Sequence, residues 1–89
     1  MRDPVDGNAT AGELSAVFGV DMTVAVASCE SCGDTRAVAE LAAYRDAAGL
    51  VLRCVSCAAI ELRFVRADGR AWLDMRGMRV IELSVPADE

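Results

Sequence analysis

Four cysteines constrain the fold of this chain more than any other feature. They are Cys29, Cys32, Cys54 and Cys57, in the pattern C-x2-C-x21-C-x2-C. Each C-x-x-C turn can direct two sulfurs to the same side, and a strand-turn-strand excursion between the turns can bring the two pairs together. The spacing therefore predicts a tetrahedral metal site made of four thiolates.

Zinc is the expected metal, because closed four-cysteine sites are typical of structural Zn²⁺. Iron also suits four sulfurs and is the less favoured alternative, since Tyr44, Phe64 and Trp72 are few aromatic side chains to shield an electron carrier. Disulfides, in one of three pairings, are a further alternative. No secretory signal follows Met1 and no apolar run is long enough to span a membrane, so we expect a cytoplasmic protein, in which disulfides are rare.

The composition explains why such a chain needs a metal ion. It has 89 residues, of which 54% are hydrophobic but only 4% aromatic. A core this small is marginal by itself, so we expect the metal to supply much of the folding energy. The chain has no histidine, which excludes the commonest general base and every histidine-containing metal site. A closed site with four protein ligands points to a protein that is not an enzyme and has no small-molecule substrate.

The chain is expected to form one domain over residues 10–85, with a flexible lead-in at 1–9 and a tail at 86–89. A short N-terminal helix is predicted to begin at the N-cap Thr10 and to end before Gly19. Its apolar face would consist of Leu14, Val17 and Phe18. This face is expected to close the domain's own core.

The remainder of the domain is predicted to be mostly β. We expect a strand from Met22 to Ser28 that leads into Cys29. Residues 36–44 fit either a helix or a strand, and we interpret them as a strand. Further strands are predicted at 50–53, at 60–64 with Ile60, Leu62 and Phe64 facing inward, at 71–76 and at 80–85. Asp68-Gly69 is a strong hairpin signal.

The two C-x-x-C turns differ in one residue. Gly33 follows the first pair, where a left-handed backbone is often needed. Ala58 stands at the corresponding place after the second pair, which implies either mild strain or a different turn.

Arginines surround the predicted hairpin and suggest a contact surface. A partner or a nucleic acid could bind Arg63, Arg66, Arg70 and Arg76 together with Trp72, which is either exposed or packed against the N-terminal helix. The alternative is a solvated hairpin whose arginines pair with Glu61, Asp68 and Asp74. The net charge of the whole chain is −5, so we expect a protein partner rather than a nucleic acid, and no membrane partner.

The two cysteine turns, Cys29-Glu30-Ser31-Cys32-Gly33 and Cys54-Val55-Ser56-Cys57, resemble those of zinc ribbons. More closely, the chain resembles a family of small bacterial proteins of unknown function. The matching segments are Asp6-Gly7-Asn8-Ala9, Phe18-Gly19-Val20-Asp21-Met22-Thr23, Gly49-Leu50-Val51-Leu52-Arg53-Cys54 and Trp72-Leu73-Asp74-Met75-Arg76-Gly77. The resemblance implies a zinc-ribbon-like β domain with antiparallel hairpins and a leading helix, and it implies no activity.

The favoured hypothesis is a small zinc-binding module that acts as a protein-interaction or regulatory adaptor. A nucleic-acid-binding ribbon is the first alternative. A thiol-based redox or metal sensor, which would lose its zinc on oxidation, is the second.

Overall fold

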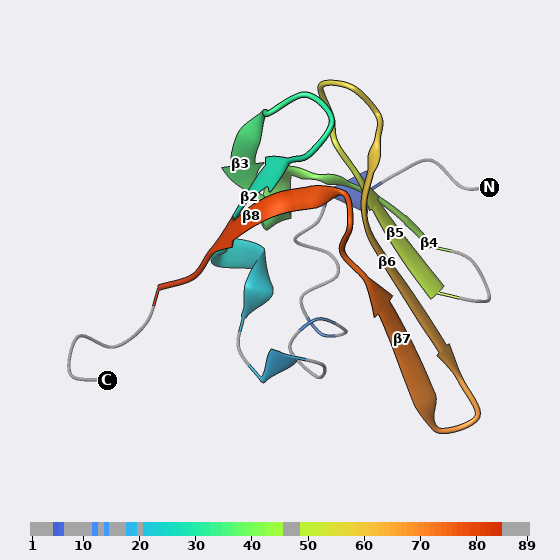
Figure 1. Cartoon of the computed structure of the whole chain (residues 1–89). Helices are drawn as coiled ribbons and strands as arrows, with labels where there is room; N and C mark the ends of the chain where they lie inside the picture. The colour runs from blue at the N-terminus through green and yellow to red at the C-terminus, as the bar shows by residue number, and fades with distance from the viewer. Residues whose placement is uncertain are drawn as a thin grey trace.

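A computed structural model describes residues 5–6, 12, 14, 18–19, 21–45 and 49–84. These residues form short strands and two single turns of 3-10 helix (Figure 1). The strands are β1 (Val5–Asp6), β2 (Val26–Cys29), β3 (Thr35–Ala37), β4 (Ala42–Arg45), β5 (Gly49–Arg53), β6 (Ile60–Ala67), β7 (Arg70–Asp74) and β8 (Met78–Glu82). The 3-10 turns are η2 (Met22–Val24) and η3 (Val38–Glu40). The predicted mostly β fold is confirmed.

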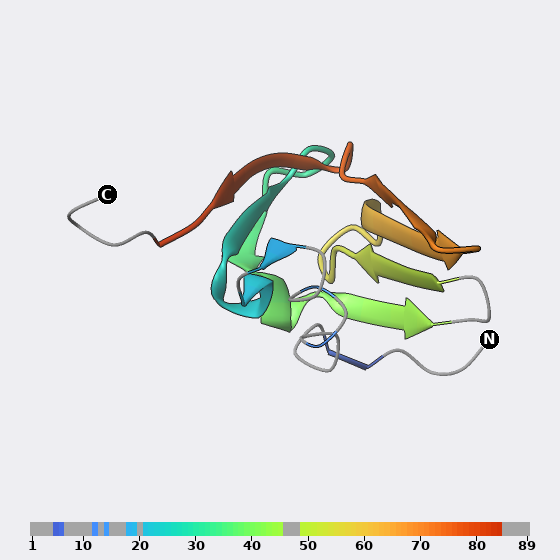
Figure 2. The same cartoon turned by 90° about the horizontal axis from the view of Figure 1, so that it is seen from below.

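The strands belong to two antiparallel sheets. One has five strands in the order β1-β4-β5-β6-β7, and the other has three in the order β3-β2-β8. Seen from below, β2 and β8 curve along one side of the molecule and β4 to β7 fan out on the other (Figure 2). The chain therefore crosses between the sheets more than once: between β1 and β2, at η3 between β3 and β4, and again between β7 and β8.

The crossing at η3 corrects two sequence predictions. Residues 36–44 were expected to form one strand, but β3 and β4 belong to different sheets and η3 separates them. The Val38 amide donates to the Ala25 carbonyl at 2.9 Å, which fixes η3 against the start of β2. The predicted strand at Met22–Ser28 is likewise η2 in its first half, where the Asp21 side chain accepts from the Thr23 amide and caps the turn.

The hairpin of β6 and β7 forms as predicted around Asp68-Gly69. Both residues have positive φ, 53° and 74°, as a type I′ turn requires. The pairing with β5 contains an irregularity: Leu52 lies opposite Leu62, but Arg53 lies opposite Ile60. Glu61 is thus an extra residue in the ladder, a β-bulge, and the inward and outward faces of β6 change places there.

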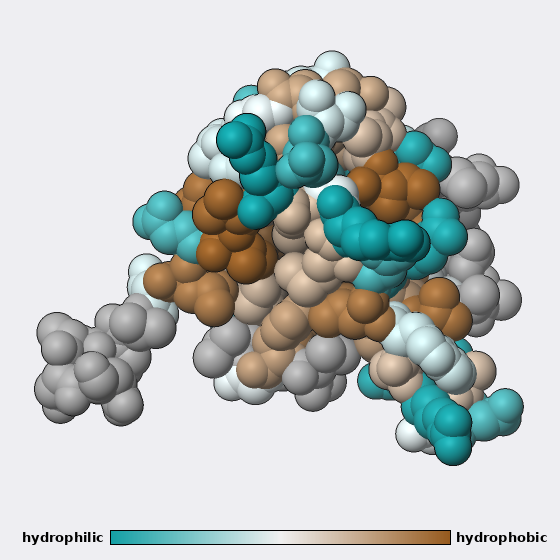
Figure 3. Space-filling model, viewed as in Figure 1, coloured by the Kyte–Doolittle hydropathy of each residue, from teal (hydrophilic) through white to brown (hydrophobic). Residues whose placement is uncertain are grey.

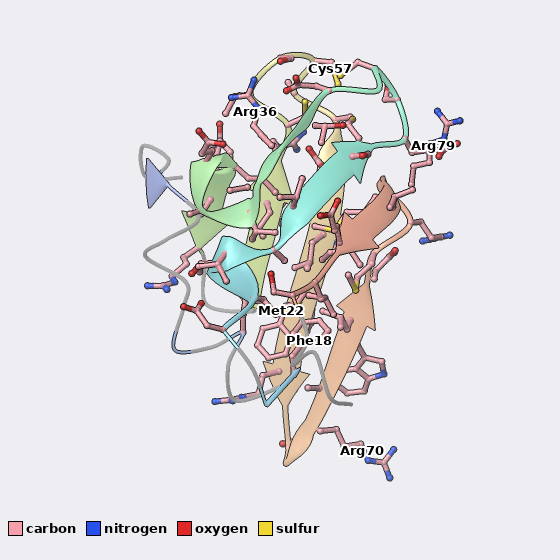
Figure 4. The ribbon with its side chains drawn as sticks, turned by 90° about the vertical axis from the view of Figure 1, so that its left-hand side faces the viewer. Phe18, Met22, Arg36, Cys57, Arg70 and Arg79 are labelled. Carbon is pink, nitrogen blue, oxygen red and sulfur yellow. The ribbon has the colours of Figure 1, made fainter. Side chains whose placement is uncertain are left out.

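The core fills the space between the two sheets. Its buried side chains come from β2, η2, η3, β4, β5 and β6, with one from the N-terminal segment: Leu14, Met22, Ala25, Ala27, Val38, Leu41, Ala43, Leu50, Leu52, Leu62 and Phe64. Phe18 packs against this cluster, near Met22 (Figure 4). Most of the core side chains are Ala, Val and Leu, so the core is thin.

The predicted N-terminal helix is not supported, because no continuous α-helical segment occurs among the described residues. Most of residues 10–18 lie outside the described residues, but Leu14 and Phe18 contribute to the core as expected. Val5 and Asp6, inside the predicted lead-in, pair with β4 as strand β1. The boundaries at 1–9, 10–85 and 86–89 stay predictions.

Some large apolar side chains remain exposed. They include Val80 on β8 and Leu83 just after it, and the space-filling view shows apolar surface at this side of the molecule (Figure 3). Within the described part of the chain, no helix is long and apolar enough to cross a membrane.

Candidate metal centre

The four cysteines lie at the tips of two hairpins that belong to different sheets. Cys29 ends β2, and Cys32 follows in the turn to β3. Cys54 comes directly after β5, and Cys57 follows in the turn to β6. The sulfurs gather at one end of the molecule, next to Cys57 (Figure 4). The two pairs that the sequence predicted are therefore brought together.

The two cysteine turns have the same backbone hydrogen bonds. In the first, the Cys29 amide donates to the Asp34 carbonyl and the Gly33 amide donates to the Cys29 carbonyl, both at 2.9 Å. In the second, the Cys54 amide donates to the Ala59 carbonyl and the Ala58 amide to the Cys54 carbonyl, again at 2.9 Å. The expectation of a different turn after the second pair is therefore wrong.

The other expectation for Ala58, mild backbone strain, is confirmed. The φ of Ala58 is +66°, close to the +79° of Gly33. A left-handed conformation costs an L-residue about 1–2 kcal/mol. The second turn keeps the geometry of the first at this cost.

The sulfur positions fit a tetrahedral metal ion. Cys29 Sγ lies 3.7 Å from Cys57 Sγ, and Cys32 Sγ lies 3.7 Å from Cys54 Sγ. All four sulfurs lie within 4.8 Å of one another. Zn–S bonds of about 2.3 Å place the sulfurs of a tetrahedron about 3.8 Å apart, whereas a disulfide needs about 2.05 Å. The four side chains could hold one metal ion, and none of them forms a disulfide.

Both close sulfur pairs join one turn to the other. A metal ion bound here would link the β2–β3 hairpin to the β5–β6 hairpin, and so one sheet to the other. Cys29 and Cys54 are buried, while Cys32 and Cys57 are exposed.

Polar groups around the sulfurs support the arrangement. The Ser56 amide points at Cys54 Sγ at 3.4 Å. Asp34, from the first turn, accepts at Oδ2 from Ser56 Oγ of the second turn at 2.9 Å and from Arg36 Nε at 2.6 Å. The hydrogen bond from Arg36, followed by that from Ser56, holds the pKa of Asp34 below its usual value. Asp34 thus connects the two cysteine turns a second time, independently of the sulfurs.

The crowding of four thiols affects their ionisation. The Asp34 amide donates to the Cys32 sulfur and lowers its pKa, but partial desolvation of the sulfur and its contacts with the three neighbouring thiols outweigh this and raise the pKa to about 12. A bound cation reverses such a shift, because metal ligands must be thiolates.

Glu61 is a feature of the site that sequence reasoning missed. The alternation along β6 placed Ile60 inward and Glu61 outward, but the bulge turns Glu61 into the interior, where only 2% of its surface is exposed. Its carboxyl group interacts with the Cys54 thiol, and burial raises its pKa above the ordinary value. Its Oε1 atom has no hydrogen-bond partner among the described residues. The burial of Glu61 could not be predicted from the sequence. Residues 60–64 of β6 alternate regularly between apolar and polar, and the bulge is defined only by the pairing with β5.

The strain at Ala58 gives a first prediction. Ala58→Gly is expected to stabilise the folded protein by about 0.5–1 kcal/mol, because the relief of strain exceeds the entropy that glycine adds to the unfolded chain. Urea unfolding of the metal-loaded protein measures the effect. Ala59→Gly is the matched control and should destabilise the protein by a similar amount, because Ala59 has no positive φ. A destabilised Ala58→Gly variant would contradict the prediction.

The link through Asp34 gives a second prediction. Asp34→Ala is expected to weaken zinc binding about tenfold, since it removes the hydrogen bonds that orient both cysteine turns. Competition with a zinc-binding dye measures the affinity. Asp21→Ala, which removes the same charge far from the sulfurs at the cap of η2, should leave the affinity unchanged. Equal affinities for the two variants would show that Asp34 has no role at the site.

The predicted arginine surface is only partly assembled. Arg63, Arg70 and Trp72 lie on one face of the five-stranded sheet, because Arg63 pairs with Asp74, Val65 with Trp72 and Ala67 with Arg70. Arg66 lies on the opposite face, with its guanidinium over the Phe64 ring. Arg76 follows β7 and binds both carboxylate oxygens of Asp74. Of the predicted arginine pairs, only Arg76–Asp74 forms among the described residues.

Trp72 is exposed, with 53% of its surface accessible. The expectation that it packs into the core is therefore wrong, and the expectation of an exposed side chain is confirmed.

The fold and the site together define a mostly β protein with antiparallel sheets and a cluster of four cysteines that could bind a metal ion. The chain belongs to a family of unknown function (DUF6510), whose family model matches residues 1–86. No curated protein and no solved structure matches it. The resemblance to a family of unknown function is thereby confirmed, and the resemblance to zinc ribbons stays a prediction.

Proposed function

We propose that this protein is a non-enzymatic module in which four cysteine thiolates hold one structural Zn²⁺, and that it acts as an adaptor or regulator through contact with another macromolecule. The observation that carries the proposal is the sulfur geometry, with edges of 3.7 Å between turns from different sheets. Zinc is preferred to iron because zinc accepts a closed thiolate tetrahedron with no redox role.

A structural role for the metal follows from the ligand set. Four protein ligands leave no position for an activated water or a substrate. Within the described residues, the four cysteines are the one group of His, Cys, Asp and Glu side chains close enough to hold an ion. The module therefore works by the surface that the metal holds in shape. Unpaired cysteines fit the reducing cytoplasm, where we propose that it acts.

Elemental analysis of the protein, purified without added metal, tests the proposal. One zinc ion per chain and only traces of iron are expected. Substitution of Cys32 by Ser, which removes an exposed ligand, should abolish stoichiometric zinc. Stoichiometric iron, or zinc retained by Cys32→Ser, would overturn the assignment.

A further inference from the structure

The outer face of the five-stranded sheet, turned away from the core, has an unusual set of side chains. The cross-strand register places Tyr44, Val51, Arg63 and Asp74 in one row across β4, β5, β6 and β7. The next row along β6 and β7 pairs Val65 with Trp72. Arginines, the half-buried Tyr44 and the exposed Trp72 thus share this face with the apolar Val51 and Val65.

This outer face is hollowed. One hollow of about 320 Å³ lies between Tyr44 and Val65, and a second of about 550 Å³ lies between Val65 and Trp72. Arg63 and Val65 line both, so the two hollows are neighbours, and together they are called the groove. The groove spans three strand spacings, about 14 Å, which matches about four stacked nucleotides at about 3.4 Å each.

The charge of the groove is positive, although the whole chain is acidic. Arg53, Arg63 and Arg70 lie on this face. Of the described acids near it, Asp74 accepts from Arg76 at both carboxylate oxygens, and Asp68 lies in the turn beside Arg70. Arg63 and Arg70 form no salt bridge within 4 Å among the described residues, although the charge of Arg63 also acts on Asp74, its cross-strand neighbour. The acidic Asp21, Glu40 and Glu82 lie on other elements. Salt screens charges beyond about 8 Å under physiological conditions, so the local charge decides what binds here.

Both ends of the groove offer flat stacking surfaces. At one end, Trp72 is half exposed. At the other end, the Arg53 guanidinium lies over the Tyr44 ring, 5.9 Å from its centre, and is held by a hydrogen bond to the Ala58 carbonyl at 2.8 Å. Nucleobases stack on both indole rings and guanidinium planes. An acidic peptide would satisfy the arginines but would leave these flat surfaces without a matching partner.

We propose that this groove binds single-stranded nucleic acid, with a base stacked on Trp72 and phosphates bound by Arg63 and Arg70. The proposal rests on the function proposed above, a binding module held by zinc, and names its partner class. It also revises the hairpin surface expected from the sequence. Arg66 takes no part, Arg76 lines the groove but is paired with Asp74, and Tyr44 and Arg53 are added.

The chain's one tryptophan makes the test direct, because all indole fluorescence comes from Trp72. Zinc-loaded protein is titrated with a fluorescently labelled single-stranded oligonucleotide at about 50 mM and about 200 mM salt. We expect binding with quenching of Trp72, and a log–log salt slope of about −1.4 for the two phosphate contacts of Arg63 and Arg70. Polyglutamate of equal charge should bind weakly and leave the fluorescence unchanged.

Three variants complete the test. Arg63→Ala should weaken binding several-fold and reduce the salt slope by about 0.7. Trp72→Ala, measured by the anisotropy of the labelled oligonucleotide, should weaken binding about tenfold. Arg79→Ala is the matched control: it removes the same charge from an exposed residue of β8, which points away from the body at a different end from Arg70, and it should bind like the unaltered protein (Figure 4).

The zinc content of each variant separates the two proposals. If the unaltered protein and the variants contain zinc but the unaltered protein does not bind the oligonucleotide, the nucleic-acid proposal alone is overturned. Binding of polyglutamate as tight as that of the oligonucleotide would assign the groove to an acidic protein instead. Equal losses for Arg63→Ala and Arg79→Ala would show that the groove has no special role.

Discussion

Removal of the metal ion is expected to unfold the protein. Structural zinc contributes an apparent free energy of about 10–16 kcal/mol to the folding of small domains at neutral pH. The core cannot replace this, because it is made mainly of Ala, Val and Leu and has Phe64 as its one fully buried aromatic side chain among the described residues. The far-UV circular dichroism of the β-sheets should therefore collapse when a strong chelator is added.

Two controls make this result specific to the site. Adding zinc after the chelator should restore the spectrum, which excludes irreversible aggregation. Cys29→Ser combined with Cys54→Ser should give the unfolded spectrum without any chelator, because both buried ligands are lost. A spectrum that stays the same after the chelator has removed the metal would show that the sheets fold without it.

Gly77→Ala is expected to destabilise the folded protein by at least about 3 kcal/mol. A Cβ atom at Gly77 would lie 1.8 Å from the Ile60 carbonyl oxygen and 2.6 Å from the Glu61 Cα, so backbone would have to move. The Gly77 carbonyl also accepts from the Glu30 amide of the first cysteine turn at 2.8 Å. The substitution therefore separates the β7–β8 connection from both β6 and this turn.

Thermal unfolding of the zinc-loaded variant measures the loss, expected as a fall in Tm of about 12 °C or more. Gly12→Ala is the matched control, because nothing lies within 4 Å of a Cβ at that position and its φ is not positive. It should leave the Tm nearly unchanged. A Gly77→Ala protein as stable as Gly12→Ala would show that the backbone at Gly77 does not approach β6 this closely.

The local features of the fold could be predicted from the sequence because they depend on short-range chemistry. The cysteine spacing is enough to predict two matched turns, and Asp68-Gly69 is enough to predict the turn of the β6–β7 hairpin. Leu62 and Phe64 face inward as the alternation along β6 indicated.

The failures of the sequence predictions lie where distant contacts decide the structure. No residue within 36–44 indicates that the chain changes sheet at η3. The change depends on a hydrogen bond from the Val38 amide to the Ala25 carbonyl, thirteen residues earlier in the chain. Glu61 is turned inward by a bulge that only the pairing with β5 defines. The separation of Arg63 from Arg66 has a local cause instead: β6 continues to Ala67 rather than ending at residue 64, and residues three apart on one strand lie on opposite faces.

The arrangement of the two sheets gives the metal its importance. Each cysteine turn closes a hairpin of one sheet, and the only strand-to-strand pairings in the described chain lie within a sheet. A metal ion at the sulfurs would hold the hairpin tips together at one end, while the thin core holds the sheets together along their length. Zinc would therefore determine the shape of the groove on the five-stranded sheet as well.

Native mass spectrometry of the purified protein tests the central claim most directly, because one spectrum distinguishes zinc, iron, disulfides and free thiols. From the proposed zinc site we expect the mass of one chain with one Zn²⁺, and four cysteines that alkylate only after the metal is removed. A metal-free chain whose mass is reduced by the hydrogens lost in disulfide formation, or a folded metal-free chain with four reactive thiols, would contradict it.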